Sequence, residues 1–332
     1  SIDLTSWNFF VATKADLNKN YNAIFTKGND SNENYEFLTF SNGLFHTPLK
    51  FTDTSRDSPN STSGQYSTTN FDVFEYSFSS IGRDVYKNNN SILTDNVSKT
   101  PLVNNLDLYI GNERLTSDRF LNGRISEMIF YNQPLNLAER IIVSNYLSAK
   151  FARTLSSIDF YDEDTSGGNF DHKVAGIGQA SDGTSHTDSQ GTGIIRINTP
   201  SALSNGDFLF WGEDVKDADY EFSSSLSTAY AERLDTKWRV SKTNNTGGDV
   251  GLGTVSFSVN ASDITYDPLD SCNGLKLIVS SSSTFATKTT YDLELSSGVY
   301  STTSPVSFSD NDYFTLEYIN LIVVDDVQFY NG

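Results

Sequence analysis

The chain has 332 residues with 42 acidic and 23 basic side chains, which gives a formal net charge of −19 and a pI near 4.4. This charge argues against binding to nucleic acid or to an anionic membrane, both of which recruit basic surfaces. No apolar run approaches the ~20 residues of a membrane span, and no signal peptide opens the chain at Ser1. The single Cys272 excludes an internal disulfide.

The composition is typical of β-sheets joined by polar loops. The chain holds 23 Phe and 17 Tyr, so it can bury a core despite its many Ser, Thr and Asn residues. Only one Met and one Cys are open to oxidation, and the surface is strongly acidic. We therefore expect an extracellular protein, located on a bacterial cell surface.

The first half alternates strand-like runs with turns. Apolar and alternating runs predict strands at residues 7–12, 23–26, 35–40, 71–78, 106–110 and 123–131. Asn42-Gly43 predicts a tight hairpin between two of them. Residues 52–69 are rich in Ser, Thr, Asn and Asp, and they predict a long exposed loop.

Residues 134–151 break the β pattern and predict a helix. Their apolar residues recur with a 3.6-residue period, and Asn136 is placed as the N-cap with Glu139 as its capping-box partner. A single helix after a run of strands would mark the end of a domain. We therefore place a first domain at residues 1–153.

The second half again predicts short antiparallel strands, as in a β-sandwich with long loops. The predicted strands are residues 173–178, 193–198, 208–212, 235–240, 255–259, 275–279 and 313–318. We place the second domain at residues 154–318 and interpret 319–332 as a linker or the start of a further module. The fold class expected is all-β, with two antiparallel β-sandwich domains.

The segment Gly123-Arg-Ile-Ser-Glu-Met-Ile-Phe-Tyr-Asn132, followed by Pro134-Leu and a helix ending in Tyr-Leu-Ser-Ala-Lys-Phe151, resembles the end of a concanavalin A-like jelly roll of the laminin-G-like type. Leu108-Tyr-Ile-Gly-Asn112 resembles the strand that precedes this unit. The resemblance covers roughly residues 4–151 and implies a first sandwich that is N-terminally incomplete. It raises the expectation of sugar binding by analogy of fold.

The second half resembles an uncharacterised β-rich domain of large exported surface proteins of Bacteroidetes and marine bacteria. The residues that carry this resemblance are Asp171-His-Lys-Val-Ala-Gly-Ile-Gly178, Gly206-Asp-Phe-Leu-Phe-Trp-Gly212, Arg233-Leu-Asp-Thr-Lys-Trp-Arg-Val240 and Asn311-Asp-Tyr-Phe-Thr-Leu-Glu317. The resemblance implies an adhesin-like protein exported as type IX secretion cargo, with the secretion machinery and other domains of a larger surface protein as partners. It implies no reaction.

No group of residues in the sequence has the pattern of a catalytic site. His46, His172 and His186 are scattered, and no nucleophile motif surrounds them. The carboxylate spacing of concanavalin-like glycosidases is not found either. We therefore expect no catalytic residues and no enzyme, with a polysaccharide hydrolase, or its accessory carbohydrate-binding domain, as the alternative.

Calcium is the one cofactor that the sequence suggests. Asp162, Asp164 and Asp171 bracket a Gly-Gly turn, and Ca²⁺ takes its ligands from such oxygen-rich loops. A solvated acidic turn is the alternative interpretation, because no Glu follows at the twelfth position. Weaker candidates are Asp182, Asp188, Asp214, Asp217 and Asp219.

The expected function is that of a non-enzymatic surface module that binds a polysaccharide or cell-surface glycan, or that acts as a spacer. Sugar binding would need an exposed aromatic side chain close to polar groups. Tyr66, Tyr86, Tyr131 and Phe45-His46 lie at or near predicted loops. Each of them fits edge packing better, so the sequence names no ligand-binding residue.

Overall fold

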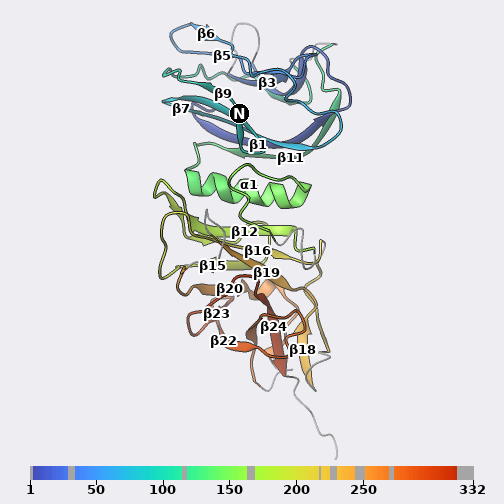
Figure 1. Ribbon diagram of the computed structural model, residues 1–332, viewed down its shortest axis with the longest axis vertical. Coiled ribbons are helices and arrows are strands. Elements are labelled where there is room, and N and C mark those ends of the chain that lie inside the picture. The colour runs from blue at the N-terminus through green and yellow to red at the C-terminus, as the bar shows by residue number, and fades with distance from the viewer. Residues whose placement is uncertain are drawn as a thin grey trace, which may run out of the picture. The chain divides into compact units, whose positions relative to one another are not determined.

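The computed structural model describes residues 3–28, 34–113, 118–162, 169–216, 218–224, 230–243, 251–268 and 273–319. These residues form antiparallel sheets and a single α-helix, α1 (Leu137–Phe151), so the predicted all-β class and the predicted helix are confirmed (Figure 1). The predicted module at residues 319–332 lies, from residue 320 on, outside the described residues.

The chain divides into two compact units. The first unit holds residues 1–136 and 151–159, and the second holds residues 137–150 and 160–332. Most of α1 therefore groups with the second unit, whereas the sequence analysis placed the helix at the end of the first domain. One reason is Asn145, whose side-chain oxygen accepts the backbone N–H groups of Phe160 and Tyr161 at 2.9 and 3.0 Å.

The first unit is a sandwich of two antiparallel sheets, which Figure 1 shows as separate layers. The five-stranded sheet has the order β11 (Gly123–Tyr131), β1 (Trp7–Ala15), β7 (Asp72–Ser79), β8 (Gly82–Lys87) and β9 (Asn90–Asp95). The four-stranded sheet has the order β10 (Leu108–Ile110), β2 (Asn22–Lys27), β3 (Tyr35–Thr39) and β4 (Phe45–His46).

Aromatic side chains fill the space between these two sheets. Trp7 is fully buried and packs on Phe9, Tyr35, Tyr76 and Phe78, with ring centroids 4.9–5.7 Å apart. Such ring pairs add to the stability gained from burying apolar area alone. The many Phe and Tyr residues of the sequence thus serve mainly as core in this unit.

The register of β1 defines two ends of the five-stranded sheet. At one end Trp7 lies opposite Phe78, the residue next to the last of β7. At the other end Ala15 lies opposite Gly123, which begins β11. The loops at these two ends are therefore separated by the nine residues of β1, or about 30 Å of extended strand.

The loops of the first unit agree only in part with the predictions made from the sequence. The hairpin at Asn42-Gly43 is confirmed, since β3 pairs with β4 and Gly43 adopts a φ of 71°. The loop predicted at residues 52–69 is partly wrong, because β6 (Arg56–Asp57) lies within it and pairs with β5 (Leu49–Lys50). Polar residues at a sheet edge can pair without showing an apolar pattern.

The second unit is built on one long antiparallel ladder. Its strands run in the order β13 (Ser185–His186), β12 (His172–Gln179), β16 (Phe208–Glu213), β19 (Trp238–Thr243), β24 (Tyr313–Ile319), β21 (Lys276–Ser280), β22 (Thr289–Ser296), β23 (Val299–Thr302), β20 (Ser256–Asn260), β15 (Ile195–Asn198) and β14 (Asp188–Ser189). A side ladder joins β17 (Phe222–Ser224) to β18 (Ala231–Leu234), and β18 to β24. Strands β14 and β15 contact β12, so the ladder folds back around one core.

All seven strands predicted in the second half are present. The short strands β13, β14, β17 and β18 and the hairpin β22–β23 were not predicted. The turn residues of this hairpin, Ser297 and Gly298, both have positive φ, at 51° and 81°. The dipeptide Ser-Gly is a turn signal, and the flanking residues alternate apolar with polar. The signal was therefore present in the sequence.

Candidate functional site

Three exposed apolar side chains lie close together at the end of the first unit where β1 stops. Leu17 (59% exposed) follows β1, Ile110 (57%) ends β10, and Phe120 (47%) lies three residues before β11. The backbone N–H of Leu17 donates to the carbonyl of Asn122 at 3.3 Å. The backbone N–H of Leu121, next to Phe120, donates to the carbonyl of Gly111, next to Ile110, at 2.8 Å. Single exposed apolar residues are normal, but a group of them indicates an interaction surface.

Two basic side chains lie against aromatic rings at the same end. The Lys19 ammonium is 3.4 Å from the centroid of the Phe120 ring and donates to the carbonyl of Asp118 at 3.0 Å. Partial burial lowers the pKa of Lys19, and the negative charge of Asp118 opposes this shift. The Arg119 guanidinium lies 3.9 Å from the Tyr21 ring centroid. Both geometries are those of cation–π contacts.

Further contacts hold these side chains in place. Glu113 is almost fully buried, and its carboxylate binds the Arg119 guanidinium at 2.6 Å. The Tyr21 ring packs on Phe40 with centroids 5.1 Å apart, and Phe40 meets His46 at 5.2 Å. The aromatic–cation patch is the name used below for Leu17, Lys19, Tyr21, Ile110, Arg119 and Phe120.

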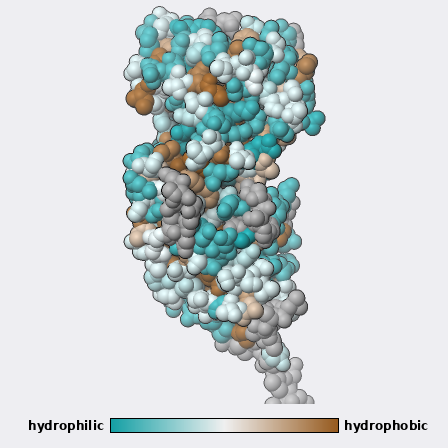
Figure 2. All heavy atoms as spheres, viewed as in Figure 1, coloured by the Kyte–Doolittle hydropathy of each residue, from teal (hydrophilic) through white to brown (hydrophobic). Residues whose placement is uncertain are grey.

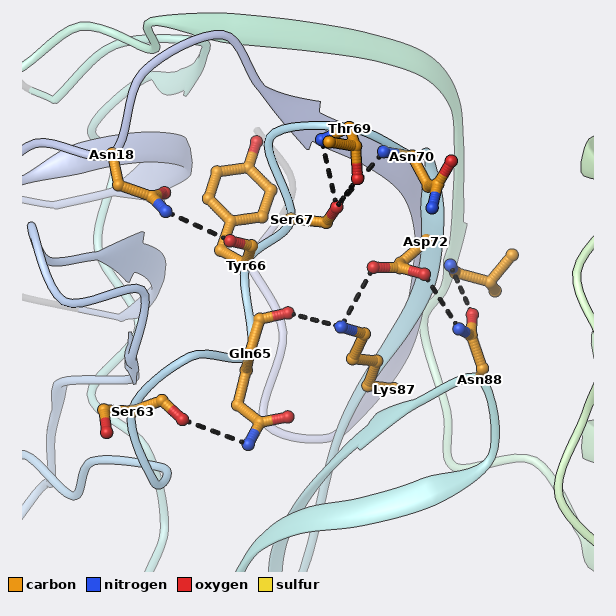
Figure 3. Close-up of polar contacts among 11 residues, drawn as sticks. Asn18, Ser63, Gln65, Tyr66, Ser67, Thr69, Asn70, Asp72, Lys87 and Asn88 are labelled. Carbon is orange, nitrogen blue, oxygen red and sulfur yellow. Dashed lines mark hydrogen bonds and ion pairs between the residues drawn. The ribbon is translucent and has the colours of Figure 1, made fainter.

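Asparagine and lysine side chains fix the loops at this end. Asn18 donates to the carbonyl of Tyr66 at 3.1 Å, which ties the loop after β1 to the loop before β7 (Figure 3). In the same view Lys87 donates to the Gln65 carbonyl at 2.8 Å and pairs with Asp72 at 3.0 Å. These bonds make the loops beside the patch a rigid support, which favours preorganised binding.

A groove of ≈ 520 Å³ lies at the opposite end of the five-stranded sheet, where β1 begins. Its lining consists of six hydroxyl side chains with one cation, one aromatic and one proline: Thr5, Ser6, Ser79, Ser80, Ser98, Thr100, Lys99, Phe78 and Pro134. Lys99 pairs with Asp53 at 2.9 Å. Hydrogen bonds from Ser55 and then from Lys99 lower the pKa of Asp53 to about 2.

Two carboxylates meet a buried arginine elsewhere in the first unit. The Arg83 side chain is fully buried and binds Asp95 at 3.0 Å and also Asp57. Burial, and then a hydrogen bond with Asp57, raise the pKa of Asp95. Carboxyl groups in direct contact are closer than the about 5–9 Å that glycosidase mechanisms need. The cluster therefore fits a neutralised structural role.

Two of the three predicted calcium ligands lie within the described residues. Asp162 accepts the Ser241 hydroxyl at 2.8 Å, and Asp171 contacts the His172 ring at 2.9 Å. Asp164 lies outside the described residues. No group of three His, Cys, Asp or Glu side chains that could hold a metal ion is found in the described part of the chain. The calcium site stays a prediction.

Most of the weaker acidic candidates accept hydrogen bonds from nearby residues. Asp182 accepts the amide of Thr184 at 2.9 Å, Asp188 pairs with Arg196, and Asp214 accepts the amide of Lys237 at 2.9 Å. Asp217 lies outside the described residues, and Asp219 is exposed.

The aromatic residues singled out in the sequence are mainly packing residues. Tyr66 and Phe45 are buried, and burial raises the pKa of Tyr66 to about 12. Tyr86 and Tyr131 are half-buried, and His46 contacts Asn60 at 2.7 Å. Their interpretation as packing residues therefore holds for the two buried rings.

The sequence analysis missed the aromatic–cation patch. Its residues come from the loop between β1 and β2, from the end of β10 and from the segment before β11. A weak signal was present, since a basic residue lies next to or near an aromatic one in Lys19-Asn-Tyr21 and in Arg119-Phe120. Only the fold brings these segments together.

Comparison with known proteins gives one family and several similar folds. The family model described as "Domain of unknown function (DUF8202)" matches residues 139–312. No curated protein matches the chain.

Three solved structures illustrate the similarity. The CBM40 of the Ruminococcus gnavus IT-sialidase, bound to α2,3-sialyllactose, is 13% identical, with a TM-score of 0.34, over 41% of this chain and 80% of that one. The heptameric SAP-like pentraxin of Limulus polyphemus is 15% identical, with a TM-score of 0.33, over 46% and 74%. The binding domain of Botulinum Neurotoxin DC in complex with SialylT is 10% identical, with a TM-score of 0.35, over 95% and 79%. The family match covers more than half of the chain, and the chain therefore belongs to the DUF8202 family.

Proposed function

We propose that this chain is a non-enzymatic, extracellular binding module whose first unit binds acidic glycans through the aromatic–cation patch. The observation that carries the proposal is the contact of two cations with two aromatic rings, Lys19 on Phe120 and Arg119 on Tyr21, beside exposed apolar side chains. The proposal names the patch as the ligand site and a sugar acid or sulfated sugar as the ligand class.

The exposed Phe120 ring suits the apolar face of a sugar. A pyranose presents C–H groups on one face, and aromatic side chains with a polar rim are the usual partners of such amphipathic surfaces. Phe120 keeps 47% of its surface exposed even though Lys19 lies over its ring. A sugar ring can therefore pack on Phe120 with an acidic group close to the Lys19 ammonium.

The charge of the whole chain makes local cations necessary for such a ligand. A protein with a net charge of −19 repels anionic polymers at long range. The Lys19 ammonium can reach a carboxylate or sulfate directly, while Arg119, which is paired with Glu113, holds the Tyr21 ring in place. This attraction is short-ranged and depends on the patch geometry, so it favours discrete acidic sugars over general polyanion binding.

The decisive experiment measures binding of the full chain to defined oligosaccharides by calorimetry. The panel holds acidic oligomers, such as oligogalacturonate and hyaluronan fragments, and neutral oligomers, such as cellohexaose. We expect binding to at least one acidic oligomer and a weaker signal from the neutral ones. Phe120→Ala should lower the affinity about tenfold, which corresponds to about 1.4 kcal/mol.

Two controls separate the patch from the rest of the surface. Ile81→Ala removes an apolar side chain that is 80% exposed at the turn after β7, and it should leave binding unchanged. Lys19→Ala should weaken binding and reduce its dependence on salt, because a screened charge pair is lost. Equal affinities of Phe120→Ala and Ile81→Ala would remove the patch as the ligand site.

The hydroxyl-lined groove is the second candidate position within the same function. Its six Ser and Thr side chains can exchange hydrogen bonds with a neutral polyol, and the charge of Lys99 is balanced by Asp53. The variant Ser80→Trp fills this groove without touching the patch. Loss of neutral-sugar binding in Ser80→Trp alone would assign that ligand to the groove.

The alternative of a polysaccharide hydrolase makes a different prediction. The same oligosaccharides, incubated with the chain at pH 4–8, would gain reducing ends over time. We expect no such gain while binding is retained. A steady release of reducing ends that is lost in Asp57→Asn or Asp95→Asn would replace the binding proposal with an enzymatic one.

A further inference from the structure

A buried lysine of the first unit faces a side-chain amide and a carboxylate. The Lys27 side chain is 1% exposed, and its Nζ lies 3.0 Å from Asn104 Oδ1 and 2.8 Å from Asp3 Oδ1. It also donates to the backbone carbonyls of Asn104 and Leu106 at 2.7 and 2.8 Å. Lys27 lies at the end of β2, whereas Asn104 lies in the segment between β9 and β10.

These groups have the arrangement of a nucleophile, a base and an activated carbonyl. Asp3 is within reach of the Lys27 protons, so it can serve as general base. The Leu106 amide donates to Asn104 Oδ1 at 3.0 Å, where negative charge would develop if the amide carbon were attacked. Each element of an acyl-transfer site is therefore present around one amide group.

The surroundings favour a reaction between these side chains over hydrolysis. Lys27 pairs with Tyr35 across the strands, and Tyr35 packs on Trp7, Phe9 and Phe25. Burial, and then the charge of the nearby Asp3 carboxylate, raise the pKa of Tyr35, while the Asp3 side chain itself is 29% exposed. A lysine held against an amide in such a setting gains the high effective concentration of an intramolecular reactant.

We propose that Lys27 and Asn104 form an intramolecular isopeptide bond in the folded protein. The Lys27 ammonium gives a proton to Asp3, and the neutral Nζ then attacks Asn104 Cγ. A bond forms between Nζ and Cγ, the bond between Cγ and Nδ2 breaks, and a second proton moves from Nζ to Nδ2. Nδ2 leaves as ammonia, which takes the proton held by Asp3 and departs as ammonium. No oxidant, metal or further reactant takes part.

Such a bond would give this chain a covalent cross-link that it cannot form as a disulfide. The chain has a single Cys, so no internal disulfide is available to it. The cross-link would join β2 to the segment that leads into β10, its partner in the four-stranded sheet. Cross-links between distant parts of a chain stabilise a fold by restricting its unfolded state.

The test is the intact mass of the full chain, purified folded and then denatured for mass spectrometry. We expect a mass lower than the sequence mass by one ammonia molecule, and a branched tryptic peptide that joins Lys27 to Asn104. Asn104→Ala and Asp3→Asn should each restore the full mass of their sequence. The neighbouring variant Asn105→Ala should keep the loss, because its side chain is not the proposed electrophile.

Cyclisation of an asparagine to a succinimide also releases ammonia, so a second control is needed. Lys27→Arg keeps the positive charge but lacks the nucleophile, and it should abolish the mass loss. A loss that persists in Lys27→Arg would overturn the proposal. A full sequence mass for the folded wild-type chain would overturn it as well.

Discussion

Glu213 is a fully buried carboxylate whose partners come from two strained residues. Lys173 Nζ lies 2.9 Å from one of its oxygens, and the Tyr220 hydroxyl donates to the other at 2.9 Å. Lys173 and Tyr220 both adopt left-handed backbone conformations, with φ of 47° and 53°. Such strain persists only where the surrounding contacts determine it. The network therefore fixes the backbone at the start of β12 and in the loop that holds Tyr220, and it also holds the Glu213 carboxyl group in place.

The pH dependence of stability should report on Glu213. Burial raises the pKa of Glu213 above its ordinary value of 4.5, against the opposing effects of Lys173 and Tyr220. A carboxyl group with a raised folded pKa binds more protons in the native state, so its contribution to stability is lost as the pH rises from about 4.5 through the folded pKa. We expect urea unfolding to show a steeper loss of stability between pH 4.5 and 7 in the wild type than in Glu213→Gln.

The matched control for this prediction is an exposed carboxylate. Glu294 lies on the exposed side of β22, and Glu294→Gln should reproduce the pH dependence of the wild type. The raised pKa of Asp214 also makes the free energy of unfolding fall with pH. This effect is similar in all three proteins, so it cancels when they are compared. If the free energy of unfolding falls equally with pH in the wild type and in Glu213→Gln, the pKa of Glu213 is not raised.

At the scale of elements, two glycines of β12 explain a motif of the sequence. Gly176 and Gly178 lie opposite Phe210 and Phe208 of β16. A Cβ at Gly178 would lie 2.2 Å from the Phe208 ring, and one at Gly176 would lie 2.5 Å from the Phe210 ring. The rings cover the glycines, so the pattern Ala-Gly-Ile-Gly is matched to Phe-Leu-Phe on the neighbouring strand. Aromatic cover of a strand glycine is a known way to stabilise a sheet.

A double-mutant cycle tests this pairing. Gly178→Ala should destabilise the second unit by about 1–3 kcal/mol, because the added methyl group displaces a packed ring. In the background Phe208→Leu the same substitution should cost less, because the smaller side chain can give way. Part of the cost should remain, because the added Cβ also lies 2.7 Å from the Asp207 carbonyl oxygen. Thermal unfolding of the four proteins gives the coupling energy. Costs that are equal in both backgrounds would mean that the ring is not the obstacle.

The helix α1 contributes a polar contact as well as an apolar face. Asn145 Oδ1 accepts the backbone N–H groups of Phe160 and Tyr161, both of which are buried. Asn145→Ala leaves two buried donors unpaired, and we expect a loss of about 2–4 kcal/mol in chemical denaturation. Lys150→Ala, at an exposed position of the same helix, should change stability by less than about 0.5 kcal/mol.

At the scale of the whole molecule, the charge of −19 should govern the response to ions. Added NaCl should raise the melting temperature by screening self-repulsion. If Asp162, Asp164 and Asp171 bind Ca²⁺, millimolar Ca²⁺ should raise it further than Mg²⁺, which prefers a tighter octahedral shell. The pair Asp162→Asn and Asp164→Asn should remove the calcium-specific part alone. Equal effects of the two ions in the wild type would leave screening as the explanation.

The face of the molecule that Figure 2 shows is mostly polar, as the composition suggests. Figure 2 shows a mainly hydrophilic face on which hydrophobic residues form small, separate patches. No helix among the described residues is long and apolar enough to cross a membrane.

The sequence predicted the sheets better than the site. Strand β7 was predictable because Phe74, Tyr76 and Phe78 recur at every second position, although the structure buries residues 72–76 on both faces. Helix α1 was predictable because its apolar period differs from that of the strands around it. The patch was not predictable, because the contact of Lys19 with Phe120 joins loops about a hundred residues apart. The burial of Tyr66 was also hidden, since it lies in a polar loop and its partner Thr13 lies on β1.

The two units are interleaved along the chain, because residues 151–159 return to the first unit after α1 has joined the second. Ser156 donates its amide to Asn88 O at 3.2 Å, and Asn89 donates its side-chain amide to Ser156 O at 2.7 Å. A recombination breakpoint before α1 would therefore separate residues 151–159 from the rest of the first unit. A breakpoint after residue 153 would separate α1 from the rest of the second unit. Neither breakpoint yields two complete units, so we expect gene rearrangements to move the two units together.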